Sequence, residues 1–412
     1  MKKYIYQLSF IMAVVLMLSA CVDYGDATQA VSVNVQVVAP EEFGSSGNGL
    51  EGHTVTISRA DGTKLTALTD ANGLARFSDI VPDVYTVSTS WDLTSEEYQT
   101  ITGDNVVNDG AVVSGNINSQ LIASDQTDKP LRLMTQLSIN RSLVIGKIYY
   151  AGTKDNNNKN YLAGQFIELY NQSDQPIDVS GLCIGLVESN STPAYDLEQL
   201  HSEFADSVVL MKQVFRVPDG DSKTIQPGGT LLLTNSAIDH RVNAGTDPDL
   251  TTADFEAKDL TGKTNNNADV PALDLVFTSF DQISKMNLAQ GGPTSIVIFR
   301  TNEDPAAWPL TYNYGKTQGI QSLVVPKRYV LDAVEVLKYK ATGIDLATKR
   351  LYPDLDAGYT TITSASGYTG EVVYRKTSSR RGKDGHKILQ DTNNSSNDFE
   401  ISTTISIRNY DE

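Results

Sequence analysis

The stretch GQFIELYNQSDQPIDVSGL, residues 164–182, decides the interpretation of the fold. It alternates apolar and polar residues, turns within the polar cluster 171–176, and then resumes with apolar residues. Successive side chains of a strand point to opposite faces, so Ile167 and Leu169 are expected to share one face. The pattern predicts two partnered β-strands of a sandwich, with Cys183 as a small core side chain just beyond them.

Length, composition and charge limit the classes of protein to which this chain could belong. The chain has 412 residues, which is enough for two or three domains. With 40% hydrophobic and 20% charged residues it has the composition of a folded globular protein. The formal net charge of -17 argues against nucleic acid as a partner, because such proteins carry a basic footprint.

The first twenty-one residues have the features of an export signal. Lys2 and Lys3 precede an apolar run, 8–20, that is too short to span a bilayer. The run ends in Leu-Ser-Ala-Cys, which resembles the lipobox of bacterial lipoproteins. The resemblance implies removal of residues 1–20 and acylation of Cys21, and several acyl chains give stable anchoring. An ordinary secretory signal with a chance cysteine is the alternative.

The residues after the predicted anchor suggest a location. Val-Asp-Tyr-Gly-Asp, 22–26, partly resembles the surface-export signal of Bacteroidota lipoproteins. We therefore predict an outer-membrane protein, held by its lipid at Cys21 through a tether, 21–30, and exposed on the cell surface. Once Cys21 is acylated, Cys183 has no cysteine with which to form an intramolecular disulfide.

A first domain is predicted over residues 31–124. Valines alternate with polar residues from 31 to 37, the period of a half-buried strand. The pattern T-D-x-N-G-x-A-x-F, 69–77, followed by P-x-x-Y-x-V, 82–87, resembles prealbumin-like and carboxypeptidase-regulatory-like sandwich domains. The polar segment 125–132 is predicted to be a linker.

The second domain is predicted over residues 133–412. Its segment 166–182, together with 225–233, 330–336 and 387–399, resembles lamin-tail-type immunoglobulin-like domains. The two domains together resemble an uncharacterised family of Bacteroidota lipoproteins. That family has no assigned activity, so the resemblance implies none for this chain. The fold class expected is all-β, with two β-sandwich domains, the second enlarged by insertions at about 187–224, 236–290 and 302–328.

The insertions supply the candidate binding residues, because binding groups concentrate in long loops on a rigid scaffold. Trp308, Tyr312, Tyr314 and Tyr329 could form a stacking platform for a sugar or for a loop of a partner protein. Packing at the edge of the sandwich explains the same four residues. Asp239 and His240 are the candidates in the second insertion.

No constellation in the sequence predicts catalysis. The four histidines lack zinc-ligand spacing, and no G-x-S-x-G element is present. The acidic loop 247–254 could bind Ca²⁺, but a solvated acidic loop is the simpler interpretation. The basic segment 375–387 is interpreted as a solvated hairpin, and contact with a phosphate-rich head group or an acidic partner is the alternative. No catalytic residue, metal site or cofactor is assigned.

The function predicted is therefore non-enzymatic. The protein is expected to be a cell-envelope lipoprotein that binds a ligand or a partner, as an accessory to an outer-membrane transporter. A surface adhesion or structural protein is the first alternative. A hydrolase with its site in the insertions is the second.

Overall fold

The computed structural model of the chain is all-β, as predicted, and describes residues 29–40, 43–44, 50–59, 61–102, 111–139, 142–188, 193–220, 223–263 and 265–410. The predicted signal peptide and Cys21 lie outside these residues. The chain divides into two compact units. The first comprises Met1–Trp91 and Gly115–Thr135, and the second comprises Asp92–Ser114 and Gln136–Glu412. Within the described residues, no helix has the length and apolar character needed to span a membrane.

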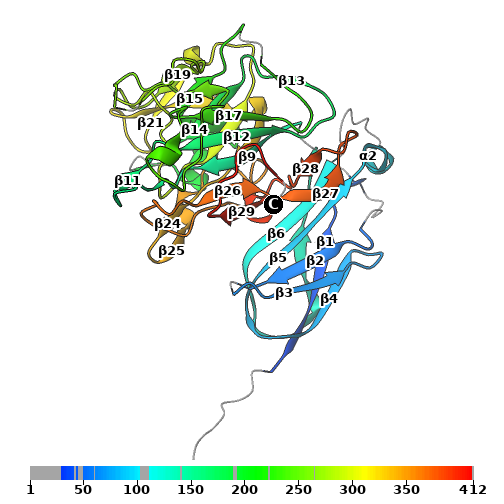
Figure 1. Cartoon of the computed structure of the whole chain (residues 1–412). Helices are drawn as coiled ribbons and strands as arrows, with labels where there is room; N and C mark the ends of the chain where they lie inside the picture. The colour runs from blue at the N-terminus through cyan, green and yellow to red at the C-terminus, as the bar shows by residue number, and fades with distance from the viewer. Residues whose placement is uncertain are drawn as a thin grey trace, which may run out of the picture. The chain divides into compact units, whose positions relative to one another are not determined.

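The first unit contains two sheets, in the strand orders β4-β1-β7 and β3-β2-β5-β6 (Figure 1). Every second residue of β1 is buried, which is the alternation predicted from the valines. A short helix, α2 (Ser95–Thr102), follows β5 in the chain. The strands are β1 (Val31–Val38), β2 (Thr54–Ser58), β3 (Lys64–Leu68), β4 (Leu74–Ile80), β5 (Asp83–Leu93), β6 (Ala111–Ile122) and β7 (Gln126–Met134).

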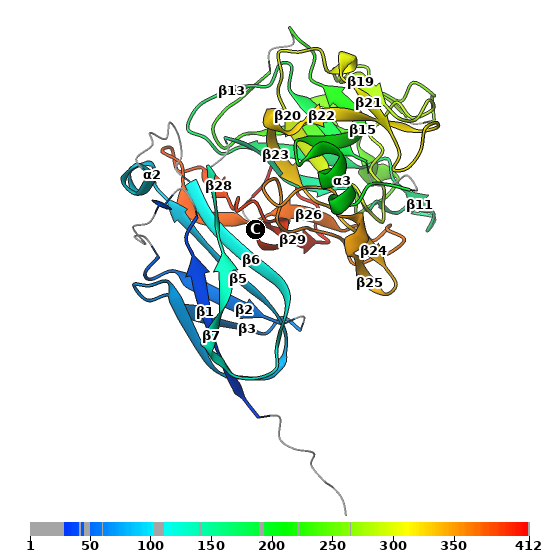
Figure 2. The ribbon, with the colours of Figure 1, turned by 180° about the vertical axis from the view of Figure 1, so that it is seen from behind.

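The prediction of a linker at 125–132 is wrong, because this segment belongs to strand β7. β7 runs parallel to β1, with Leu131 opposite Val35 and Leu133 opposite Val37 (Figure 2). In the order β4-β1-β7 it is an edge strand, where polar residues and Pro130 are tolerated. The polar composition thus reflects an edge position, while Leu133 is fully buried.

The second unit is built from two large sheets. One has the order β18-β17-β12-β9-β26-β29, and the other has the order β21-β22-β15-β14-β20-β23 with β19 also paired to β15. The strands of the first large sheet are β9 (Leu143–Tyr149), β12 (Phe166–Asn171), β17 (Thr230–Thr234), β18 (Phe255–Glu256), β26 (Val372–Arg375) and β29 (Phe399–Ser402). Those of the second are β14 (Cys183–Val187), β15 (Val208–Arg216), β19 (Asp274–Thr278), β20 (Ile296–Phe299), β21 (Leu310–Tyr312), β22 (Gln321–Pro326) and β23 (Val330–Val334).

Short hairpins and helical turns connect these strands. The short strands are β8 (Gln136–Ile139), β10 (Thr153–Lys154), β11 (Asn160–Tyr161), β13 (Ile177–Asp178), β16 (Thr224–Ile225), β24 (Lys338–Lys340), β25 (Gly343–Asp345), β27 (Thr377–Arg381) and β28 (Lys387–Leu389). The helical segments are α3 (Leu197–Phe204), α4 (Ser395–Asp398), η2 (His240–Val242), η3 (Pro305–Ala307), η4 (Lys327–Tyr329) and η5 (Leu346–Thr348).

Strand β12, the start of the stretch 164–182, lies at the centre of the first large sheet. It pairs antiparallel with β17 and β9, so the prediction that it pairs with the segment following it is wrong. That segment divides instead between β13, which pairs with β16, and β14, which belongs to the second large sheet. Both β12 and β14 are strands, as predicted, but they lie in opposing layers.

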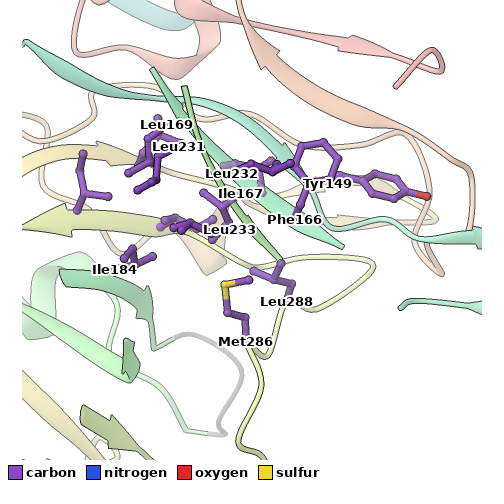
Figure 3. Close-up of a cluster of buried hydrophobic side chains, with 14 of the residues drawn as sticks. Tyr149, Phe166, Ile167, Leu169, Ile184, Leu231, Leu232, Leu233, Met286 and Leu288 are labelled. Atoms are coloured by element: carbon purple, nitrogen blue, oxygen red, sulfur yellow. The ribbon is translucent and has the colours of Figure 1, made fainter. Parts of the chain in front are cut away.

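The main core fills the space between the two large sheets (Figure 3). Ile167 and Leu169 of β12 and Leu233 of β17 belong to it, as does Ile184 from the second sheet. Figure 3 shows Met286 extending from a loop toward these side chains. Cys183, the neighbour of Ile184, lies instead in a cluster on the outer face of the second sheet, and its burial raises the thiol pKa to about 12.

The other face of β12 is covered by the C-terminal segment of the chain. Glu168 is fully buried there, and its Oε2 accepts the backbone N–H of Arg408 at 2.6 Å. The Lys147 ammonium lies 3.5 Å from its Oε1. Burial raises the pKa of Glu168, and the charge of Lys147 opposes that shift. Glu168 is thus a buried carboxylate that accepts a backbone N–H and fixes the C-terminal segment on β12.

Arg375, the last residue of β26, is buried, with 3% of its surface exposed. Its guanidinium donates to Asp332 at 2.8 Å and to Asp391 at 3.0 Å, and it lies 3.7 Å from Asp398. The interpretation of 375–387 as a solvated hairpin is therefore wrong for Arg375, which ties three carboxylates together. It holds for Arg381, which is exposed on the β27–β28 hairpin.

Candidate binding pocket

The first insertion forms a capped helix against the second large sheet. Asp196 accepts the backbone N–H of Gln199 at 2.9 Å, and the Gln199 side chain accepts the N–H of Asp196 in return. This capping box begins α3. The helix buries Leu200, and β15 follows it in the chain. The helix thereby fixes Tyr195, which is 7% exposed just before the cap.

A pocket lies between this helix, the ends of β14 and β15, and the β21–β22 hairpin. It encloses about 300 Å³ of space between atoms, part of which is open to solvent. Its enclosed part has room for a water-sized group. The lining residues are Val187, Glu188, Ala194, Tyr195, Leu200, Leu210, Tyr312, Asn313, Ser322 and Arg350.

Two polar atoms of the lining residues are unpartnered among the described residues. They are Oδ1 of Asn313, an acceptor, and Nε of Arg350, a donor, and both atoms are buried. An unsatisfied buried polar group costs about 1–3 kcal/mol, so such groups are uncommon in folded proteins. A buried donor and a buried acceptor without partners therefore belong to two residues of the pocket lining.

The Arg350 side chain is held in place by its surroundings. Its Nη1 donates to the carbonyls of Ala347 at 2.8 Å and Lys349 at 2.7 Å. Its backbone N–H donates to Oε2 of Glu335, a fully buried carboxylate, at 2.9 Å. Burial lowers the pKa of Arg350, and the charges of Glu335 and Glu188 oppose the shift. Arg350 is thus a positioned guanidinium whose buried Nε–H has no partner among the described residues.

The charges beside the pocket are of both signs. Glu188, 5% exposed, lies on the wall, and Lys212 of β15 is fully buried nearby. Burial lowers the pKa of Lys212 to about 8, while the charge of Glu188 raises it. Together with Arg350, these groups give the pocket no single dominant sign of charge.

Tyrosine rings form one side of the pocket and extend beyond it. Tyr195 contacts Tyr314 edge-to-face, with ring centroids 5.2 Å apart and planes at 68°. Tyr314 is 40% exposed, and Tyr312 is half-buried on the pocket wall. Of the four predicted platform residues, Tyr312 therefore lines the pocket, and Tyr314 lies beside it through its contact with Tyr195.

Trp308, which together with Tyr329 completes the predicted platform, is only 9% exposed. It stacks on Tyr329, with centroids 5.4 Å apart and planes at 9°, and its Nε1 donates to Glu303 at 2.7 Å. It also packs against Phe299 on the outer face of the second sheet. The structure thus shows Trp308 in the packing role that the sequence left as the alternative.

Asp239 and His240 lie in a different loop and make local contacts. Asp239 caps η2 and pairs with Arg241 at 2.7 Å. His240 is fully buried, with its Nδ1 2.7 Å from the Tyr161 hydroxyl and its Nε2 2.7 Å from the Ser236 carbonyl. Burial lowers the pKa of His240. The two side chains stabilise this loop and are not brought to the pocket.

The acidic loop is not the solvated segment that the sequence suggested. Asp247 is buried and accepts the Tyr149 hydroxyl at 2.5 Å, and burial raises its pKa to about 6. Asp254 pairs with Lys223 at 2.7 Å, while Asp249 pairs with Arg241. In the part of the chain that the structure describes, no three His, Cys, Asp or Glu side chains are grouped to hold a metal ion.

Asn313, Arg350, Glu188 and Tyr195 were missed by the sequence analysis. Asn313 carried a usable signal, because it separates two candidate tyrosines within an insertion. Arg350 carried none, since it reaches the pocket from a segment outside the predicted insertions. Tyr195 precedes the capped helix and could have been predicted to lie beside it.

Comparison with known proteins extends the description of the fold. Residues 226–406 match a family described as "Protein of unknown function (DUF4876)". The chain is also similar to the crystal structure of a DUF4876 family protein from Bacteroides thetaiotaomicron. The TM-score is 0.57 and the identity 21%, over 92% of this chain and 96% of that one. At this identity the likeness shows a shared fold.

Other comparisons are weaker. A candidate adhesin from Bacteroides ovatus matches with a TM-score of 0.19 and 12% identity, over 84% of this chain and 97% of that one. This score is too low to support an argument about fold or function. A comparison with curated proteins finds no match.

Proposed function

We propose that this protein is a non-enzymatic cell-envelope lipoprotein, and that its enlarged second sandwich binds a ligand through the pocket beside α3. The observation that carries the proposal is the pocket itself, whose lining includes Asn313 and Arg350, two residues that each have a buried polar atom without a partner among the described residues. A ligand that reached either atom would remove its desolvation penalty. Ligand sites typically combine apolar walls with a few fixed polar groups, as here.

A binding screen tests this proposal. The full-length protein in detergent is titrated with small neutral oligosaccharides and with short peptides, and binding is followed by calorimetry. We expect binding that weakens in Asn313→Leu and is unchanged in Tyr339→Ala, a half-exposed tyrosine of the β24–β25 hairpin. Binding that is equal in the wild type and Asn313→Leu would place the ligand site elsewhere.

The lipid anchor is the second part of the proposal. It rests on the sequence around Cys21, which resembles a lipobox. We expect the mature protein to begin at an acylated Cys21, as measured by mass spectrometry, and to sediment with outer membranes. Cys21→Ser should release the protein into the soluble fraction. Recovery of Cys21→Ser in the membrane at wild-type level would contradict the anchor.

The proposed partner is an outer-membrane transporter to which this protein is an accessory. A lipid-anchored binding module would capture a ligand at the surface and raise its concentration at the transporter. The proposal predicts that an outer-membrane barrel protein co-purifies after mild detergent extraction. If the protein is recovered without one, the adhesion alternative is favoured.

A further inference from the structure

We infer that the second unit has another binding site, a hollow beside the β27–β28 hairpin that takes a phosphate monoester group. The hollow measures about 620 Å³, within the range of ligand pockets, and all its lining residues belong to the second unit. It shares no lining residue with the pocket beside α3, so the inference goes beyond the proposed function. Three features carry it: the charge of the lining, an arginine without a carboxylate partner, and the fixed backbone of the hairpin.

The lining of the hollow carries more positive than negative charge. Arg380, Arg381 and Lys383 belong to it, and Asp174 is the one carboxylate among the lining residues that the structure describes. The chain as a whole has a formal net charge of -17, so this positive charge is a local feature. A phosphate monoester carries a charge of about -1.5 to -2 at pH 7. Three cations beside one carboxylate match that charge better than the single charge of a carboxylate or of a sulfate ester.

Arg381 supplies N–H groups that the fold does not use for an ion pair. Its side chain is exposed, and its Nη1 donates to two backbone carbonyls, of Ser378 at 3.0 Å and of Arg380 at 2.6 Å. In the part of the chain that the structure describes, Arg381 pairs with no carboxylate. The other N–H groups of this planar guanidinium can donate to two oxygens of one phosphate group.

The other two cations of the hollow have long ion pairs. Lys383 Nζ lies 3.5 Å from Asp174, and the Lys383 side chain is 85% exposed. Arg380 Nη1 lies 3.6 Å from a carboxylate oxygen of Asp92. Ion pairs at exposed positions contribute at most about 1 kcal/mol, so a phosphate group can compete for both cations.

The backbone that carries these cations is fixed at the tip of the hairpin. Gly382 lies against the ring of His386, and a Cβ at this glycine would lie 1.8 Å from Cε1 of the ring. The backbone N–H of Lys383 donates to Oδ1 of Asp174 at 2.7 Å, which attaches the tip to the loop 171–176. A site whose backbone is ordered before binding loses less conformational entropy when the ligand enters.

The test uses full-length protein in detergent and isothermal calorimetry. Glucose 6-phosphate, glucose 6-sulfate, glucuronate and glucose present different charges on similar sugars. Short-chain phosphatidic acid presents the same monoester on a lipid, and a hexaglutamate peptide represents an acidic protein. We expect glucose 6-phosphate to bind about three- to tenfold more tightly than glucose 6-sulfate or glucuronate, because its charge is larger. Glucose should not bind.

Variants of the hollow locate the site. Arg381→Gln and Lys383→Gln should each weaken binding of glucose 6-phosphate about three- to tenfold, and the double variant about 10- to 100-fold. The double variant Arg132→Gln/Lys316→Gln makes the same change of net charge at exposed positions outside the hollow, and it should bind as the wild type does. Exposed substitutions change stability little, so the melting temperatures should agree and exclude misfolding as the cause.

Asp174→Asn provides a test in the opposite direction. Its Oδ1 can still accept the backbone N–H of Lys383, but the negative charge beside the ligand is removed. Binding of glucose 6-phosphate should therefore become about two- to fivefold tighter. Weaker binding in a variant that melts as the wild type does would contradict a site that acts through its positive charge.

Two outcomes support the inference and identify the source of the phosphate. Binding of phosphatidic acid that is lost in Arg381→Gln/Lys383→Gln would indicate a lipid head group. Binding of glucose 6-phosphate alone, lost in the same variant, would indicate a soluble phosphate ester. Asn313→Leu should bind either probe as the wild type does, so failure of this inference and failure of the pocket beside α3 can be told apart.

The remaining outcomes overturn the inference. Binding of hexaglutamate without binding of either phosphate would assign the hollow to an acidic protein. Equal affinity for glucose 6-phosphate and glucuronate would show that the hollow does not select a phosphate. Phosphate binding that is equal in the wild type and in Arg381→Gln/Lys383→Gln would place the site elsewhere. Absence of binding to every probe would show that the cations of the hairpin serve only to solvate it.

Discussion

Two buried polar regions of the second unit differ in how their hydrogen bonds are used. Around Arg375, three carboxylates surround one guanidinium, which also donates to the carbonyls of Ile145 and Gln390. At the pocket, Arg350 and Asn313 are also buried or half-buried, yet each keeps one polar atom without a partner among the described residues. The first region stabilises the fold, and the second leaves hydrogen-bonding capacity for another molecule.

This difference has an energetic consequence. Removing one member of a satisfied buried ion network leaves uncompensated charge, which is strongly destabilising. Removing an atom that has no partner relieves a desolvation penalty and should be neutral or mildly stabilising. Stability measurements on variants of the two regions can therefore separate residues retained for the fold from residues retained for binding.

The largest effect is expected for Arg375→Ala. The substitution leaves Asp332, Asp391 and Asp398 buried without their cation, so the free energy of unfolding should fall by about 3–5 kcal/mol. Chemical denaturation followed by fluorescence measures it. Arg381→Ala, at an exposed position of the β27–β28 hairpin, should change stability by less than about 0.5 kcal/mol. Equal effects of the two substitutions would contradict the role of Arg375.

Glu168→Ala is expected to have the second-largest effect on the free energy of unfolding. It removes the acceptor of the Arg408 backbone N–H and the partner of the buried Lys147 ammonium. The free energy of unfolding should fall by about 2–4 kcal/mol, because a buried charge and a buried donor both lose their partner. The melting temperature of the purified variant measures this. A wild-type value would show that the C-terminal segment does not depend on Glu168.

Asp247→Asn should change how stability depends on pH. The pKa of Asp247 in the folded chain is about 6, above its ordinary value near 3.9. Between pH 4 and 6 the folded state therefore keeps a proton that the unfolded state loses, and stability falls as pH rises. Above about pH 6 this loss of unfolding free energy is complete, and it should amount to about 2–3 kcal/mol.

The asparagine variant lacks this titration. The free energy of unfolding of Asp247→Asn, relative to that of the wild type, should rise by about 2–3 kcal/mol between pH 4 and pH 7. Urea denaturation at both pH values measures this difference. A difference between Asp247→Asn and the wild type that stays constant from pH 4 to pH 7 would show that the Asp247 carboxyl is not buried as described.

Local features of the fold could be predicted from the sequence. The valine alternation of β1, the Asp196 capping box of α3 and the strand over Phe166–Asn171 all follow from patterns within a few residues. Local hydrogen bonds and side-chain periodicity determine such elements, and both are visible in the order of residues.

Pairing over long distances could not be predicted. The neighbours of β12 are β9 and β17. No pattern in the segments between these strands indicates that they pair. The same holds for Arg375, whose carboxylate partners come from distant positions, and for Arg350 at the pocket. Burial of Asp247 was missed because an acidic loop has the same composition whether its carboxyls face solvent or a tyrosine.

The measurement that tests the central claim most directly is the unfolding free energy of Asn313→Leu in the absence of ligand. Asn313 Oδ1 has no hydrogen-bond partner among the described residues, so its replacement by an apolar side chain should leave stability unchanged or raise it by up to about 1 kcal/mol. A loss of more than about 1 kcal/mol would show that the fold itself uses this side chain, and the distinction between the two polar regions would not hold.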